Sequence, residues 1–273
     1  MLGYPRIGPA RELKRALESY WSGTTTEEDL LTAGRQLCEQ TWTTLRDQGL
    51  GSIPSSTFSL YDQVLDTAAR GVPDAPALEM TKWFDTNYHY LVPNSRFALT
   101  GTAPIDEVRE AQALGITPRP VLFGPVTFLL LAKPTEPGFT PLEPLDELLP
   151  AYAELLGKLA DEGVEWVQSD EPAFATDRTT PEFNALTRAY HWLAKKNHRP
   201  KLLAAGYFGG LGRALGVLAR SPSEAIAVDL VTDESFAGNV AAEGALRDKE
   251  VLAGAVDGRN VTSTRRACRT GPR

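Results

Sequence analysis

Basic residues gather at the start of the first predicted helix, in the stretch GPARELKRALESYW. Arg11, Lys14 and Arg15 are three and four residues apart, so they share one helix face. The unpaired amides of a first turn already carry partial positive charge, and Glu12 offsets only part of the added charge. A bound anion would resolve this unfavourable field. The alternative is a solvated basic face with ion pairs, for example between Arg11 and Glu18.

A second polar group lies in MTKWFDTNYHY, residues 80–90. Strict alternation in this segment places Lys82 on one face, with Phe84 and Tyr88, and Asn87 on the other. Such a polar and aromatic edge suits a flat ring that carries carboxylates. The alternative is an exposed hairpin with aromatic anchors.

Two adjacent carboxylates, Asp170 and Glu171, follow the apolar segment 164–169. Catalytic groups in α/β barrels gather at the carboxyl ends of strands, so the pair is a candidate site. Adjacent residues of an extended chain point in opposite directions, and only one of the two side chains is therefore expected to face the mouth of a barrel. An unrelated barrel enzyme that uses the two groups as an acid–base pair is one hypothesis.

Strand-like and helix-like segments alternate along the chain, which predicts a parallel sheet with helices outside it. A short crossover is expected after Leu65, and the last twelve residues contain four arginines and no acid. The expected strands are residues 2–7, 56–61, 120–127, 164–169, 201–207, 225–231 and 250–256, and the expected helices are residues 12–21, 26–48, 104–114, 145–162, 181–196, 210–219 and 240–248.

The composition excludes several classes of protein. A net charge of -7 over 273 residues indicates neither a nucleic-acid partner nor an anionic membrane surface. Cys38 and Cys268 are far apart, and neither they nor the three histidines have ligand spacing, so we expect no disulfide framework, no metal and no cofactor held by this chain. No apolar run is long enough to span a bilayer, and we expect a soluble cytoplasmic protein.

Several long segments carry a resemblance to a known family. LGYPRIGPARELKRALESYW, FSLYDQVLD, EMTKWFDTNYHYLVP, RPVLFGPVTFLLLAKP, VEWVQSDEPA, AVDLV and GAVDGRNV resemble, in this order, the N-terminal half of cobalamin-independent methionine synthases. These enzymes are 5-methyltetrahydropteroyltriglutamate–homocysteine methyltransferases. The resemblance implies an α/β fold of two (β/α)8 TIM-type barrels face to face, with folate polyglutamate between them and zinc in the C-terminal barrel.

This chain resembles the first barrel only. We expect an incomplete (β/α)8 barrel with about seven of eight strands over residues 1–261, and a basic tail, residues 262–273, that is disordered or foreign to the domain. A barrel that lacks a strand exposes unpaired backbone, so self-association or weak cooperativity is expected.

The resemblance also implies a set of site residues. Arg11, Glu12 and Lys14 match the family's RELK stretch that contacts folate polyglutamate, and Lys82 and Asn87 match folate contacts in the second segment. Asp170 and Glu171 are secondary candidates, since the corresponding carboxylates of the other barrel serve homocysteine, and here they are either a duplicated relic or ligand contacts. No catalytic residue and no metal ligand is expected in this chain.

The implied activity is methyl transfer from 5-methyltetrahydrofolate polyglutamate to homocysteine. A thiol is a weak nucleophile at neutral pH, and the family activates it as a zinc-bound thiolate, so we expect the isolated chain to be inactive. The alternative is a stand-alone folylpolyglutamate-binding module that acts with a separate zinc-barrel protein.

Overall fold

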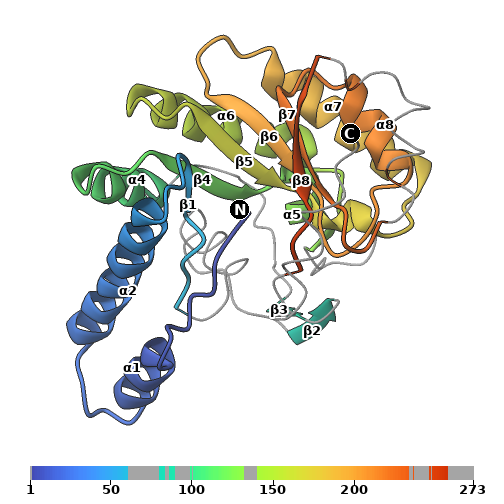
Figure 1. The fold of residues 1–273 in the computed structure, drawn as a ribbon. Helices are drawn as coiled ribbons and strands as arrows, with labels where there is room; N and C mark the ends of the chain where they lie inside the picture. Colours follow the sequence, from blue (N-terminus) through green and yellow to red (C-terminus); the bar gives the residue numbers. More distant parts are fainter. Residues whose placement is uncertain are drawn as a thin grey trace.

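The chain folds around one curled parallel sheet. The computed structural model describes residues 2–60, 80–83, 86–89, 99, 101–131, 140–233, 236, 246 and 248–257. Six parallel strands hydrogen-bond in the order β1-β4-β5-β6-β7-β8, and the two end strands are not paired with each other (Figure 1). The strands are β1 (Ile53–Ser55), β4 (Pro118–Phe123), β5 (Trp166–Asp170), β6 (Lys201–Ala205), β7 (Ala225–Asp229) and β8 (Glu250–Gly254).

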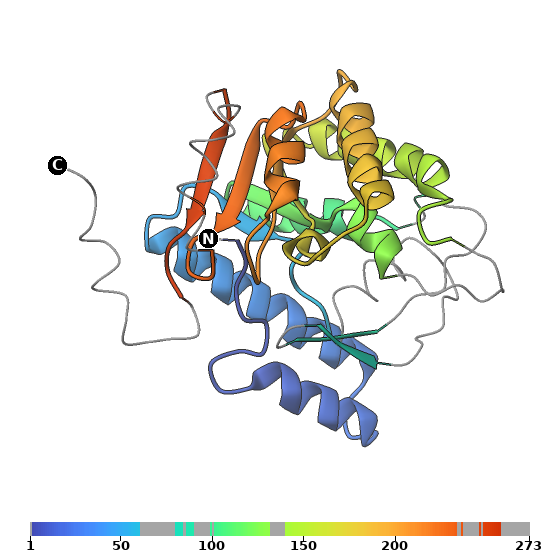
Figure 2. The ribbon, with the colours of Figure 1, turned by 90° about the vertical axis from the view of Figure 1, so that its right-hand side faces the viewer.

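Helices cover the outer face of this half-barrel, and the α1–α2 pair extends away from it (Figure 2). Among the described residues, no helix is both long and apolar enough to cross a membrane. The helices are α1 (Glu12–Trp21), α2 (Glu27–Asp47), α4 (Ala103–Ala113), α5 (Pro125–Leu130), α6 (Leu145–Asp161), α7 (Thr180–Ala194) and α8 (Arg213–Arg220), with a 3-10 turn η1 (Pro172–Ala175) after β5.

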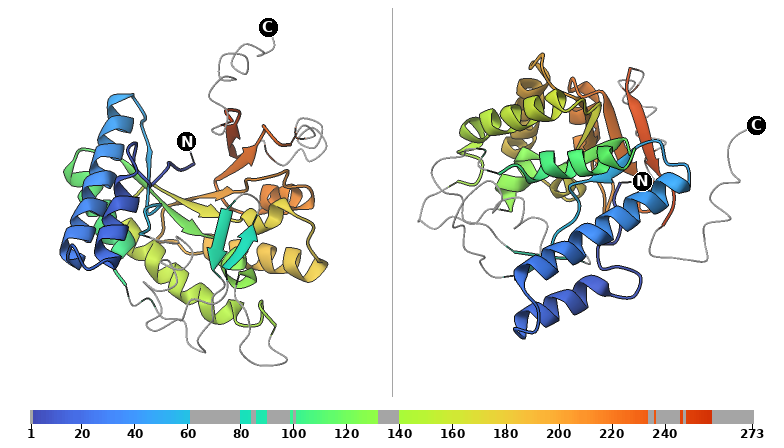
Figure 3. Two further views of the ribbon diagram at one scale, coloured as in Figure 1. Left: turned by 90° about the horizontal axis from the view of Figure 1, so that it is seen from below. Right: turned by 90° about the vertical axis from the view of Figure 1, so that its left-hand side faces the viewer.

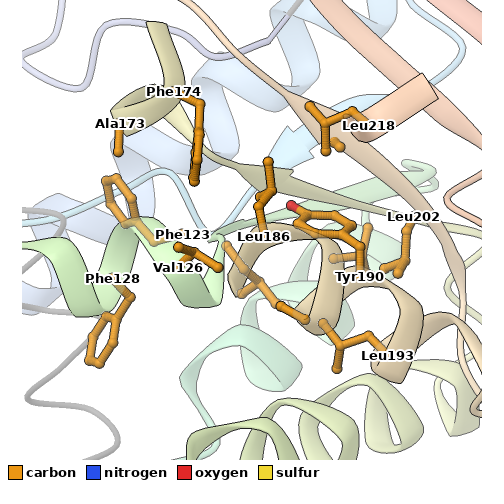
Figure 4. Packing of buried hydrophobic residues seen from close by; sticks show 14 of the residues in the cluster. Phe123, Val126, Phe128, Ala173, Phe174, Leu186, Tyr190, Leu193, Leu202 and Leu218 are labelled. Atoms are coloured by element: carbon orange, nitrogen blue, oxygen red, sulfur yellow. The ribbon is translucent and has the colours of Figure 1, made fainter. Parts of the chain in front are cut away.

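The main core fills the layer between the sheet and its outer helices. Figure 4 shows Phe174, Leu186 and Tyr190 packed among other apolar side chains of this layer, and Tyr190 is fully buried. Its hydroxyl lies 2.8 Å from Ser169 Oγ. The inner face of the sheet is lined by small residues of β6 and β7, such as Ala205 and Ala227. Strands β4 to β7 are therefore buried on both faces, as expected inside a parallel sheet, whereas β8 at its edge is largely exposed.

The α1–α2 pair has its own core. A capping box begins α2, where Thr26 Oγ1 accepts from the amide of Asp29 at 3.2 Å and Asp29 Oδ2 accepts from the amide of Thr26 at 2.9 Å. Trp42 is fully buried, and its Nε1 donates to the hydroxyl of Tyr4 at 2.8 Å. This bond fastens the N-terminal segment to α2.

The helix predictions agree with the structure where it describes them. The helix at residues 12–21 is confirmed at both ends, and five others are confirmed within about three residues. Of the predicted helix 240–248 the structure describes only residues 246 and 248, which lie in turns, and the crossover after Leu65 and the tail 262–273 lie outside the described residues. The predicted strand 120–127 ends instead at Phe123, because the chain turns at Gly124 and α5 begins at Pro125.

Two strand predictions are wrong. Residues 2–7 form an irregular segment and no strand, because Gly8 at φ 82° turns the chain. Hydrogen bonds to the side chains of Trp42 and Gln168 hold this segment in place of hydrogen bonds to a neighbouring strand. The predicted strand 56–61 lies too late, since β1 covers Ile53–Ser55 and Ser56 has a positive φ of 59°. The amide of Ser56 donates instead to Glu107 Oε2 at 2.7 Å.

A short hairpin stands apart from the sheet. Strands β2 (Met80–Trp83) and β3 (Thr86–His89) pair antiparallel, so this segment forms a hairpin. Viewed from below, the hairpin lies in front of the parallel sheet (Figure 3, left). The hairpin and α1 both lie below the sheet in Figure 1, at the end where the parallel strands finish.

Candidate functional site

The start of α1 is a tight turn held by its own carboxylate. The main-chain amide of Arg11 donates to the oxygen of Gly8 at 3.1 Å, and Glu12 Oε2 accepts from the amide of Ala10 at 3.0 Å. Arg11 adopts the left-handed conformation, with φ 61° and ψ 38°. A side chain at Gly8 would overlap the Glu12 carboxylate. Glu12 therefore fixes the turn that precedes the helix.

The cations of this turn face solvent. Arg11 is exposed, and no carboxylate among the described residues forms an ion pair with it. Lys14 Nζ lies 3.5 Å from Glu18 Oε1, and both side chains are more than half exposed. Such a pair contributes little to stability. The ion-pair alternative thus holds for Lys14 rather than Arg11, and both cations remain accessible to an anion.

The hairpin brings two of the predicted residues into register. Lys82 in β2 is the direct cross-strand partner of Asn87 in β3. The prediction from strict alternation, which placed Lys82 and Asn87 on opposite faces, is therefore wrong. The antiparallel pairing of β2 with β3 puts the two positions directly opposite each other, and such positions share a face of the ribbon.

Asp170 ends β5 within a buried polar network. Its Oδ1 accepts from Gln168 Nε2 at 2.8 Å, and its Oδ2 accepts from the hydroxyl of Tyr207 at 2.9 Å. Burial raises the pKa of Asp170 to about 7, although both hydrogen bonds and the charge of Arg119 act in the other direction. This carboxyl group is therefore poised between its two protonation states near neutral pH.

Glu171 points away from Asp170, as adjacent residues of an extended chain must. Its side chain is fully buried against Gly124, and its Oε2 accepts from the amide of Thr127 at 2.7 Å. Burial raises the pKa of Glu171 to about 7, against the hydrogen bonds from Thr127 and Val126. In the described structure Glu171 accepts hydrogen bonds from the amides of the first turn of α5. Ligand contact by Asp170 or Glu171 stays a prediction.

Two members of the network, Arg119 and Gln168, are not among the site residues predicted from the sequence. Arg119 of β4 is buried; its Nε donates to Gln168 Oε1 at 3.3 Å and its Nη1 to Ser52 Oγ at 3.4 Å. Burial lowers the pKa of Arg119, while the charge of Asp170 raises it. The available signals were Arg119 at the second position of the apolar strand β4 and Gln168 at the third position of β5.

A zinc site does not fit the described residues. Within the part of the chain that the structure describes, no three His, Cys, Asp or Glu side chains are grouped so that they could hold a metal ion. Cys38 is buried.

The sequence matches the family described as "Cobalamin-independent synthase, N-terminal domain" over residues 1–69 and 67–269. The chain belongs to this family. The two matched segments meet just after Leu65, where the sequence analysis expects a shortened crossover, and the second extends past residue 261.

Two relatives align with almost the whole chain. The 5-methyltetrahydropteroyltriglutamate–homocysteine methyltransferase of Rhodococcus jostii is 48% identical over 291 aligned positions, which span 97% of this chain and 38% of the relative. The enzyme of the same name from Streptomyces coelicolor is also 48% identical and covers 95% of this chain, again 38% of the relative. The chain thus spans well under half the length of these relatives.

Solved structures confirm the fold class. A B12-independent methionine synthase from Shewanella sp. W3-18-1, in complex with selenomethionine, matches with a TM-score of 0.65 and 14% identity over 86% of this chain and 73% of that one. A methyltransferase from Methanosarcina mazei matches with a TM-score of 0.54 and 14% identity over 80% and 68% of the two chains. The α/β half-barrel is therefore part of a known barrel fold.

Proposed function

We propose that these 273 residues form the folate-binding part of a 5-methyltetrahydropteroyltriglutamate–homocysteine methyltransferase and do not transfer the methyl group by themselves. The observation that carries the proposal is the 48% identity to methyltransferases of that name over nearly the whole chain. Identity at this level, spread over the entire half-barrel, supports a shared ligand as well as a shared fold.

The start of α1 supplies the charges that a polyglutamate tail needs. Arg11 and Lys14 are exposed cations beside helix amides, and both side chains can donate charge-assisted hydrogen bonds to the carboxylates of such a tail. Glu12 acts through the turn, since its bond to the amide of Ala10 holds the preceding backbone in place. In this proposal Glu12 positions the two cations rather than binding the tail.

The hairpin supplies a second anchor. Lys82 and Asn87 are cross-strand partners, so an ammonium and an amide come from neighbouring positions on one face of the ribbon. We assign them to the ring end of the folate or its first carboxylate, which is the chemistry that an ammonium and an amide recognise together.

The zinc-dependent step is assigned to a second barrel, as the family resemblance implies. When bound there, zinc would keep the homocysteine thiol as a thiolate. The partners of this chain in the proposal are therefore a small-molecule folate and a zinc barrel, either on the same polypeptide or as a separate protein.

Calorimetry and an activity assay test the proposal. We expect the chain to bind 5-methyltetrahydrofolate triglutamate more tightly than the monoglutamate and to form no methionine alone. Methionine should form when a zinc barrel from a relative is added. Methionine production by the chain alone, or equal affinity for the two folates, would contradict the proposal.

A further inference from the structure

Two residues of the turn before α1, Gly8 and Arg11, have a positive φ, of 82° and 61°. Glycine adopts this conformation freely, but for arginine it is strained and persists only where surrounding contacts hold it. The backbone conformation also sets the direction in which a side chain leaves the chain. The contacts that hold Arg11 in this conformation therefore decide where its guanidinium lies.

Gly8 fits closely between Glu12 and helix α2. A Cβ at Gly8 would overlap the Glu12 carboxylate and would lie 2.9 Å from Cδ2 of Leu37, a buried residue of α2. The oxygen of Gly8 accepts from the amide of Arg11, and Glu12 Oε2 accepts from the amide of Ala10. Because Gly8 has no side chain, the turn can close on Glu12 and pack against α2 at the same time.

The segment before this turn is fastened at two points. The hydroxyl of Tyr4 accepts from Nε1 of Trp42, the fully buried residue of α2, at 2.8 Å. The main-chain oxygen of Leu2 accepts from Gln168 Nε2 in β5 at 3.1 Å. Figure 1 shows this segment running from the sheet to the start of α1. The turn that carries Arg11 is therefore tied to both α2 and β5.

We propose that Gly8 and Tyr4 are positioning residues for the binding of a polyglutamate tail. Neither carries a charge, and both act by holding the turn that presents Arg11 and Lys14 to the carboxylates of the tail. Charged donors that are already held in place lose less conformational freedom on binding, so positioning raises the affinity without adding a contact. The inference rests on the proposed folate function, and it assigns the preference for a long tail to the conformation of the turn as well as to its charge.

Calorimetric titration of the full chain with 5-methyltetrahydrofolate triglutamate and with the monoglutamate tests the inference. The readout is the ratio of the two affinities, because a variant that only lowers the folded fraction changes both affinities by the same factor. Gly8→Ala keeps both cations, but its Cβ displaces the Glu12 carboxylate from the amide of Ala10. We expect the triglutamate affinity of this variant to fall about tenfold and the monoglutamate affinity less than about threefold.

Gly23→Ala is the matched control. Gly23 follows α1 with a positive φ of 72°, and a Cβ there would meet no atom within 4 Å. Alanine at this position therefore has a similar backbone strain without an overlap, and the affinity ratio should equal that of the wild type.

Tyr4→Phe is the second variant, which removes the acceptor of Trp42 Nε1 and should lower the affinity ratio about threefold. Thermal melting shows that each variant is folded. An unchanged ratio in Gly8→Ala or Tyr4→Phe, or an equal loss in Gly23→Ala, would overturn this inference and leave the proposed function standing. A wild-type chain that does not prefer the triglutamate would overturn both.

Discussion

Gln168 in β5 donates a hydrogen bond from Nε2 to the main-chain oxygen of Leu2 at 3.1 Å, across 166 residues of sequence. The same nitrogen donates to Asp170, and the side-chain oxygen accepts from Arg119. One amide thus joins the N-terminal segment, a buried carboxylate and a buried guanidinium.

Replacing Gln168 with Leu should destabilise the fold by about 1–3 kcal/mol, because buried groups of Arg119 and Asp170 lose their partner. Denaturant unfolding measures the change in unfolding free energy. Gln112→Leu is the control, since Gln112 makes one exposed bond to the oxygen of Glu162 and should cost under about 1 kcal/mol. Equal losses for the two variants would show that the Gln168 network adds no stability.

Stability should fall as pH rises from about 5 to 8. Asp170 and Glu171 have pKa values near 7 when folded, against about 4 in an unfolded chain. In this window the folded state holds more protons than the unfolded state, so deprotonation costs folding energy until pH exceeds the folded pKa values. We expect a loss of about 1 kcal/mol or more, measured by denaturant unfolding at each pH.

The control for this pH profile is the double variant Asp170→Asn with Glu171→Gln, which should be nearly flat between pH 5 and 8. The lowered pKa values of Asp29 and Glu182 affect stability only at more acidic pH, because both groups are already ionised in this window. A wild-type profile that rises with pH, or an unchanged slope in the double variant, would contradict the prediction.

Gly124→Ala should be strongly destabilising, by about 2 kcal/mol or more, because the new Cβ would overlap the buried Glu171 carboxylate. Gly157→Ala in α6 is the matched control, since the nearest atom to its Cβ is His198 Cδ2 at 3.7 Å. This helix variant should be neutral or more stable by about 0.5–1 kcal/mol. Thermal melting compares the stability of the two variants. An unchanged melting temperature for Gly124→Ala would show that the Glu171 side chain does not pack against Gly124.

Arg11→Gln and Lys14→Gln should each weaken binding of 5-methyltetrahydrofolate triglutamate about tenfold and affect the monoglutamate less, since each removes a charge-assisted bond to the tail. Arg35→Gln is the control, because Arg35 is an exposed arginine of α2 whose Nη2 donates to Thr32 Oγ1 at 3.2 Å. The triglutamate affinity should also fall with added salt. Calorimetric titration measures both effects. Equal losses of triglutamate affinity in all three variants would show that Arg11 and Lys14 do not contact the tail.

The sequence determined the local elements and the family. Helix periodicity, together with the Gly and Pro signals, located α1 at both of its ends, and short apolar runs located β5 to β8 within a few residues, because both depend on interactions between near neighbours. Ordered matches over the whole chain pointed to the right family for the same reason, since each motif is a local string.

Tertiary structure decided how distant residues meet. Lys82 and Asn87 are cross-strand partners only because β2 and β3 run antiparallel. Residues 2–7 form no strand, and two of them make long-range hydrogen bonds instead: the main-chain oxygen of Leu2 accepts from Gln168 and the hydroxyl of Tyr4 accepts from Trp42. Asp170 and Glu171 are neighbours in sequence, yet one joins the inner network and the other the first turn of α5. Burial, register and long-range hydrogen bonds depend on segments that a local pattern does not contain, so only the folded chain assigns these roles.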